Sequence, residues 1–232
     1  LLRLFPIVSI LLYISACAVK PAGDLDSPEY HHKAGMRHVE MGQYNEALTS
    51  FNRATDLDKK FAPAYAGMGI AYANMEDKKK AKKYAGKAQD LAGKDPDVLT
   101  LCARVWIDLR HQEKKWYKDA EKLLKKALKR KKNHEGATYY TGELYLYQYE
   151  FSQAEDHFRK VVEMKGEYSG KADKMWQMSQ KIVRAMPGTL VGKKVALHEE
   201  ITRADLAVLL AEELKISTLM ERQTTPSSGF QT

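Results

Sequence analysis

Cysteine is scarce in this sequence, with two residues among 232, Cys17 and Cys102. Cys17 follows an apolar N-terminal run, whereas Cys102 lies in an amphipathic segment far along the chain. Because the two occupy such different contexts, a disulfide framework is excluded in practice. Cys102 falls on the inward face of its segment, so we predict a small core hydrophobe there and not a reactive thiol.

Catalytic motifs are also missing. The chain has no Gly-rich phosphate loop and no Gly-x-Ser-x-Gly elbow, and His198-Glu199-Glu200 lacks the second histidine of a zinc-protease helix. Three histidines near the N-terminus have no cysteine beside them, and we interpret them as exposed helix residues: His31, His32 and His38. We therefore expect no enzyme activity, no cofactor and no metal site.

The apolar run at the N-terminus is short. Residues 1–16 contain one basic residue, Arg3, and an apolar stretch over residues 7–14 that ends in small side chains. Such a stretch does not span about 30 Å of hydrocarbon comfortably, so we predict a signal peptide over residues 1–16 in place of a stable membrane helix.

Ile14-Ser15-Ala16-Cys17 resembles a bacterial lipobox, an apolar residue and two small ones before a cysteine. The resemblance implies cleavage before Cys17, lipid attachment to Cys17 and, because Ala18 follows, an outer-membrane location with the chain on the periplasmic face. An ordinary cleavage site or a short anchor that contains a cysteine is the alternative. Residues 17–27 carry Pro21 and Gly23, and we interpret them as the lipidated tether.

Compact side chains recur along the chain at a fixed interval. Tyr44, Ala47, Phe51 and Ala54 follow one another at steps of three, four and three, which is the apolar stripe of one helical face. The same stripe returns at spacings of 34, 39 and 34 residues, as shown by Ala47, Ala81, Ala120 and Ala154 and by the upstream Gly35, Gly69, Ala103 and Gly142.

This pattern resembles the tetratricopeptide repeat, a helix pair of 34 residues. The resemblance implies an all-α, right-handed superhelical array of four helix pairs over residues 28–168, with units at 28–61, 62–95, 96–134 and 135–168. Residues 169–187 are amphipathic, and we predict a capping helix there because a repeat array must cover its open apolar end. The third unit has five residues more than the period allows, which lengthens its first helix or enlarges its turn.

Ile201-Thr202-Arg203-Ala204-Asp205 resembles the helix that begins an S-layer homology domain, a cell-wall-binding module. Thr202 and Asp205 form a pair similar to a capping box. We assign residues 188–221 to a partial segment of this type, with Arg203 as a possible contact to wall polymer, and residues 222–232 to a disordered tail. The alternative is a capped helix that covers the array.

The concave side of a tetratricopeptide array is where the family usually binds peptides. By repeat register, the resemblance places eleven residues on that groove: Glu29, His32, Met36, Glu40, Ile70, Asn74, Arg104, Asp108, Tyr139, Glu143 and Tyr147. Their mixture of aromatic and charged side chains suits an extended or helical peptide. The Lys/Asn set that clamps a terminal carboxylate in chaperone-binding members is missing.

The net charge of +8 favours anionic surfaces but is not specific for nucleic acid, and we expect no nucleic-acid partner. The lysine clusters at 78–83 and 125–132 fall on second helices, and we interpret them as a solvated face, with attraction to lipid headgroups or wall polymer as the alternative. We expect a lipid-anchored scaffold that holds a protein or peptide of a bacterial envelope assembly, similar in plan to pilotins and assembly factors. The second hypothesis is a protein that binds peptidoglycan or wall polymer through its C-terminal segment.

Overall fold

The computed structural model describes residues 23, 26–198 and 200–212, and these form eleven α-helices and no β-strand. The predicted signal peptide, Cys17, most of the tether, residues 213–221 and the tail lie outside the described residues. Within the described ranges, every helix is too short or too polar to cross a bilayer.

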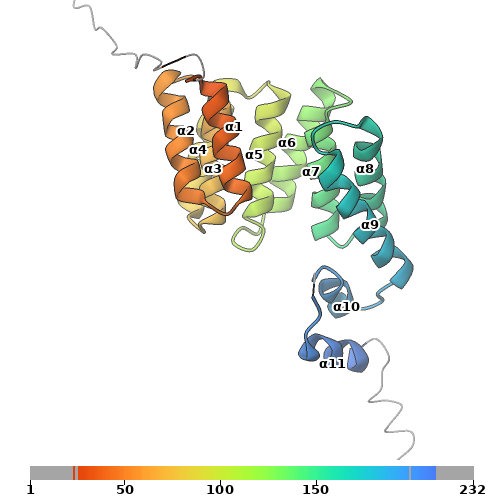
Figure 1. Cartoon of the computed structure of the whole chain (residues 1–232). Helices are drawn as coiled ribbons and strands as arrows, with labels where there is room; N and C mark the ends of the chain where they lie inside the picture. The colour runs from red at the N-terminus through yellow and green to blue at the C-terminus, as the bar shows by residue number, and fades with distance from the viewer. Residues whose placement is uncertain (1–22, 24–25, 199, 213–232) are drawn as a thin grey trace, which may run out of the picture.

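Eight helices form four successive pairs that stack side by side (Figure 1). The pairs are α1 (Pro28–Glu40) with α2 (Tyr44–Leu57), α3 (Ala62–Asn74) with α4 (Lys78–Ala92), α5 (Pro96–Asp108) with α6 (Trp116–Arg130), and α7 (Glu135–Tyr147) with α8 (Phe151–Met164). The predicted fold class, an all-α superhelical repeat array, is confirmed.

The helix starts follow from local sequence. Ser27 precedes Pro28, and its hydroxyl accepts a hydrogen bond from the Tyr30 N–H at 3.1 Å. Asp95 precedes Pro96, and its carboxylate accepts hydrogen bonds from the backbone of Asp97 and Val98. A side-chain acceptor followed by proline suits a helix N-terminus, because proline has no N–H to leave unpaired.

Small residues are required where an aromatic ring lies between helices. Phe51 is 0% exposed, and a methyl group added to Gly35 of α1 or Gly67 of α3 would lie 2.5 Å from its ring. Phe158 has the same relation to Gly142 of α7, at 2.7 Å. The expected small positions therefore let first helices approach the rings of second helices, and Gly67 is a further such position that the repeat pattern did not indicate.

The array curves because its two layers of helices differ in spacing. Each first helix packs against the next first helix, α1 on α3, α3 on α5 and α5 on α7, whereas no comparable contact joins successive second helices in the described part of the chain. The first helices therefore line the concave side and the second helices the convex side. Cys102 of α5 is completely buried between these layers, and burial raises the pKa of its thiol to about 12, which confirms the prediction of a core residue.

Four of the five extra residues of the third unit lie in its turn, and the fifth lies in the first turn of α6. α5 has 13 residues, like α1, α3 and α7, and ends at Asp108. The turn to α6 then covers residues 109–115, whereas the other three turns cover 41–43, 75–77 and 148–150. The inserted residues thus enlarge a surface turn and leave Ala120 completely buried in register with Ala81.

α9 (Ser169–Ala185) packs against α8 and buries Ala172, Ser179 and Ile182, so it covers the end of the array. The chain continues through α10 (Leu190–Val195) and α11 (Arg203–Glu212), which lie beyond that end (Figure 1).

The capping pair that opens α11 is confirmed. Thr202 Oγ1 accepts a hydrogen bond from the Asp205 N–H at 3.1 Å, and Asp205 Oδ2 accepts one from the Thr202 N–H at 3.0 Å. No described residue of α11 is buried, and its extensive contacts are with α10. The alternative in which this helix covers the array is therefore wrong.

Candidate partner-binding groove

The first helices and α9 enclose a cavity of about 190 Å³ on the concave side. It brings together side chains from α1, α5, α7 and α9 that are as far as 131 residues apart in the sequence. Its lining consists of Glu40, Arg104, Asp108, Tyr139, Tyr140, Glu143, Tyr147 and Lys171. Six of the eleven residues predicted for the groove are in this set.

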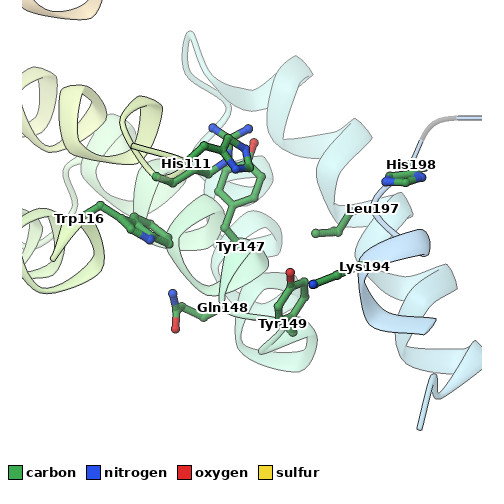
Figure 2. Close-up of a pocket in the computed structure, with 9 residues that line it drawn as sticks. His111, Trp116, Tyr147, Gln148, Tyr149, Lys194, Leu197 and His198 are labelled. Atoms are coloured by element: carbon green, nitrogen blue, oxygen red, sulfur yellow. The ribbon is translucent and has the colours of Figure 1, made fainter. Parts of the chain in front are cut away.

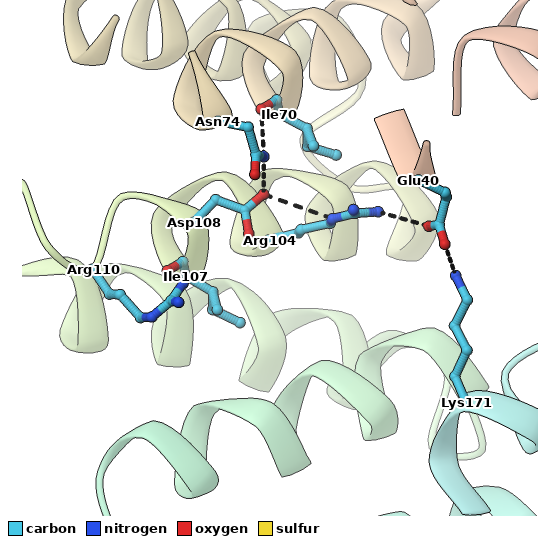
Figure 3. Close-up of polar contacts among 8 residues, drawn as sticks. All are labelled: Glu40, Ile70, Asn74, Arg104, Ile107, Asp108, Arg110 and Lys171. Atoms are coloured by element: carbon cyan, nitrogen blue, oxygen red, sulfur yellow. Dashed lines mark hydrogen bonds and ion pairs between the residues drawn. The ribbon is translucent and has the colours of Figure 1, made fainter. Parts of the chain in front are cut away.

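Arg104 is the centre of the cavity's ionic contacts (Figure 3). Its guanidinium lies 3.5 Å from Glu40 and 3.7 Å from Asp108, and its side chain is only 14% exposed. Burial raises the pKa of the Asp108 carboxyl, while Arg104 and the hydrogen bond from Asn74, at 3.0 Å, oppose that rise. A cation so enclosed holds two carboxylates in place and has little freedom to move toward a ligand.

Glu143 lacks an equivalent cation. Among the described residues, no lysine, arginine or histidine nitrogen lies within ion-pair distance of its carboxylate, and the uncharged phenol of Tyr139 favours its charged form, as Arg104 does. Burial, reinforced by the negative charge of Asp108, raises the pKa of Glu143 to about 7, although Arg104 opposes the shift. The groove can therefore gain or lose a proton near neutral pH.

Lys171 of α9 reaches across the groove to Glu40 of α1, and its Nζ donates a hydrogen bond to Glu40 Oε2 (Figure 3). This contact joins the first and ninth helices over the concave face. Lys171 is 50% exposed, so solvent and a partner can reach it. Lys171 and Tyr140 were not expected in the groove: α9 was predicted only as a cap, and Tyr140 is the neighbour of a residue already assigned by register.

The remaining predicted residues lie elsewhere. Asn74 is exposed beside the cavity, where its amide also donates to the carbonyl of Ile70. Ile70 itself is completely buried, so its side chain belongs to the core and does not line the groove. Met36 is half-buried against the core, and Glu29 is exposed in the first turn of α1. Arg203 is exposed at the start of α11 and is not among the residues that line the cavity.

His32 is half-buried against aromatic rings, with ring centroids 5.9 Å from Phe51 and 6.0 Å from Phe61. Burial lowers its pKa to about 4, so it is neutral at physiological pH. The interpretation as an exposed histidine is therefore wrong for His32, and His31 and His38 are half-buried as well. Its neighbours form separate contacts, His31 with Asp26 at 2.7 Å and His38 with Gln43 at 2.8 Å.

No group of three His, Cys, Asp or Glu residues in the described part of the chain is arranged to hold a metal ion. The groove instead combines tyrosine rings with paired charges, which is chemistry for binding a polypeptide. An array of paired helices with a polar, aromatic concave face defines a helical-repeat interaction protein as the class.

Comparisons with known proteins identify the repeat type. A family model described as TPR repeat matches residues 35–75, and a second, described as Tetratricopeptide repeat, matches residues 62–95. The chain therefore contains tetratricopeptide repeats, a fold that is typically non-catalytic and binds protein partners. No curated protein matches the chain at a significant level.

Solved structures agree on the fold. A thermophilic TPR protein of Thermus thermophilus, TTC0263, is 15% identical with a TM-score of 0.56, and the match covers 84% of this chain and 96% of that one. Pseudomonas aeruginosa pilF is 16% identical with a TM-score of 0.50, and the match covers 87% of this chain and 93% of that one. At such identities the likeness concerns the arrangement of helices.

Proposed function

We propose that this protein is a lipid-anchored scaffold that holds a protein partner of a bacterial envelope assembly, as pilotins and assembly factors do, without catalysis of its own. The observation that carries the proposal is the concave cavity, where tyrosine rings surround Glu143, a carboxylate without a cationic partner in the described residues. A partner that supplies a donor or cation there would complete a contact that the free protein leaves incomplete.

Charge separation supports the concave face as the recognition surface. The first helices of the four pairs carry six acidic and three basic residues, a net of −3, whereas the second helices carry fifteen basic and eight acidic residues, a net of +7. Opposite fields on the two faces steer a partner to one of them. The acidic inner face favours a partner segment with basic side chains.

Site-specific photocross-linking in cells tests this assignment. A photoreactive residue at Asn74, which is exposed beside the cavity, should capture a discrete partner, and one at Lys126 on the convex α6 should not.

Glu40→Gln with Glu143→Gln removes groove charge with isosteric side chains, and we expect at least fivefold less cross-linked product. Asp90→Asn with Glu163→Gln makes the same charge change on second helices and should leave the yield unchanged. Equal yields from all variants would reject the groove.

The lipid anchor is supported by the lipobox and by how the chain enters the array. Asp26, next to the end of the tether, pairs with Arg53 of α2 and with His31 of α1. These contacts hold the residues just before α1 against the first helix pair. A lipid on Cys17 would then hold the first pair near the membrane. Metabolic labelling with a fatty-acid analogue should mark the full-length protein, and Cys17→Ser should abolish the label and release the protein from the membrane fraction.

Wall binding through the C-terminal segment is the second candidate, and one observation favours it. α11 is opened by its capping pair and exposes Leu206 and Leu210 on the same side as Arg203, so this face has no partner within the described residues. Sedimentation with purified peptidoglycan tests it. The full chain should sediment and Arg203→Gln should sediment at least threefold less; equal sedimentation of the two, or none of either, would remove this candidate.

A further inference from the structure

Three departures from the repeat pattern surround one cleft of about 660 Å³ (Figure 2). The enlarged turn of the third unit contributes Arg110 and His111, and Trp116 follows at the start of α6. The turn between α7 and α8 contributes Tyr149. The segment after the array contributes Lys194 of α10 from the opposite side (Figure 2).

Tyr149 occupies a backbone conformation that is unusual for its side chain. Its φ is 64°, in the left-handed region, and the matching turn positions of the first two units are Gly42 at 72° and Glu76 at 61°. The turn geometry itself therefore favours glycine. An aromatic ring at this position adds strain; the ring packs against the core, with its centroid 6.3 Å from that of Phe151, and it also forms part of the wall of the cleft.

The chemistry of the cleft is cationic and aromatic. Arg110 and Lys194 supply two permanent positive charges, and no aspartate or glutamate is among the lining residues. The guanidinium of Arg110 lies 4.2 Å from the centre of the Tyr147 ring, which holds its planar donor face in a defined orientation. Trp116 and Tyr149 add flat apolar surfaces on opposite sides of the cleft (Figure 2).

We propose that this cleft binds an acidic peptide segment that carries aromatic or large apolar side chains. Carboxylates would pair with Arg110 and Lys194, and an apolar side chain would lie between Trp116 and Tyr149. The volume lies in the range of clefts that bind several residues or a small molecule. A neutral glycan fits less well, because it offers no negative charge to pair with Arg110 and Lys194.

This site differs from the groove in the sign of its charge. The groove carries Glu40, Asp108 and Glu143, whereas the cleft carries cations, and Tyr147 lies between the two. The cleft can be tested without the groove, since its ligand class does not depend on the identity of a partner in the groove.

The test uses the full chain and a fluorescein-labelled octapeptide of alternating Glu and Phe at 50 mM salt, followed by fluorescence anisotropy. We expect saturable binding, and at least tenfold weaker binding when Gln replaces Glu in the peptide. Arg110→Gln with Lys194→Gln should weaken binding by at least tenfold. Lys79→Gln with Lys126→Gln removes the same charge from exposed sites on α4 and α6 and should change the dissociation constant less than twofold.

Two further variants separate binding from folding. Lys194 is exposed and forms no ion pair within the described residues, so Lys194→Gln alone should keep the thermal unfolding midpoint and still weaken binding by about threefold or more. Glu40→Gln in the groove should not affect the peptide. Equal losses in the cleft variant and the α4/α6 control would show general charge attraction and overturn the proposal. Tighter binding of oligothymidylate than of the acidic peptide would overturn the ligand class.

Discussion

At the residue scale, residues with different side chains adopt the same backbone conformation at equivalent turn positions. Gly42, Glu76 and Tyr149 occupy equivalent left-handed positions in their turns, at φ values of 72°, 61° and 64°. Only glycine adopts this conformation without a clash between its side chain and the backbone. The repeats therefore keep the turn even where the sequence departs from its preferred residue.

Glu76→Gly should stabilise the protein by about 0.5–1 kcal/mol, because it removes the left-handed strain and Glu76 is exposed. Gly42→Ala should destabilise by about 1 kcal/mol, and for a backbone reason alone, since an added methyl group there meets nothing within 4 Å. Urea unfolding of both variants checks the pair. A loss of stability in Glu76→Gly would show that the side chain contributes more than its conformation costs.

At the element scale, helix packing is set by rings inserted between glycines. Phe51 of α2 lies against Gly35 of α1 and Gly67 of α3, so one side chain joins three helices of two repeat units. A larger side chain at either glycine would therefore leave too little room for the phenylalanine ring at position 51.

Gly67→Ala should destabilise the array by about 1–3 kcal/mol through overpacking, because the new methyl group would lie 2.5 Å from the Phe51 ring. Phe51→Leu frees that space, so the double variant should be more stable than the sum of the single effects predicts. A double-mutant cycle from denaturant unfolding measures the coupling. Additive effects would mean that the ring moves aside without loss.

At the scale of the whole molecule, the curve of the array creates the charged groove. First helices approach one another while second helices diverge, and the side chain of Lys171 extends from α9 to Glu40 of α1. The resulting enclosure changes a proton affinity, since it raises the pKa of Glu143 to about 7.

Glu143 makes stability depend on pH in a defined direction. Between its unfolded pKa, near 4.5, and its folded pKa, about 7, the folded state holds a proton that the unfolded state has released. The Glu143 contribution to the free energy of unfolding therefore decreases as pH rises through this window. Glu143→Gln should flatten that decrease, so the variant should gain stability relative to the unmodified protein from pH 5 to pH 8.

Urea unfolding at four pH values measures this difference. His32 has the opposite effect, since its stabilising contribution is lost as pH falls from about 6.5 toward 4, but it is common to both proteins and cancels in the comparison. A constant difference between the two proteins across the range would contradict the raised pKa.

Much of the architecture could be predicted from spacing alone. Ala47, Ala81, Ala120 and Ala154 return at nearly constant intervals because each helix pair meets its neighbours through the same face, and local signals such as Ser27-Pro28 set the helix starts. The same register correctly brought Arg104, Asp108, Glu143 and two tyrosines to one cavity, since equivalent positions of successive first helices face the same side.

The burial of individual side chains and the contacts between distant segments were decided by the tertiary structure, because repeat register does not determine them. Ile70 proved to be core because α3 is enclosed by α1, α4 and α5, and His32 is shielded by rings from α2 and from the following turn. Lys171 lines the groove because its long side chain extends from the first turn of α9 to Glu40 of α1. The cleft of Arg110, Tyr149 and Lys194 forms where two turns and α10 come together. Periodic sequence determines contacts between neighbouring units, but contacts between distant segments depend on the accumulated curvature of the stack, which no single repeat encodes.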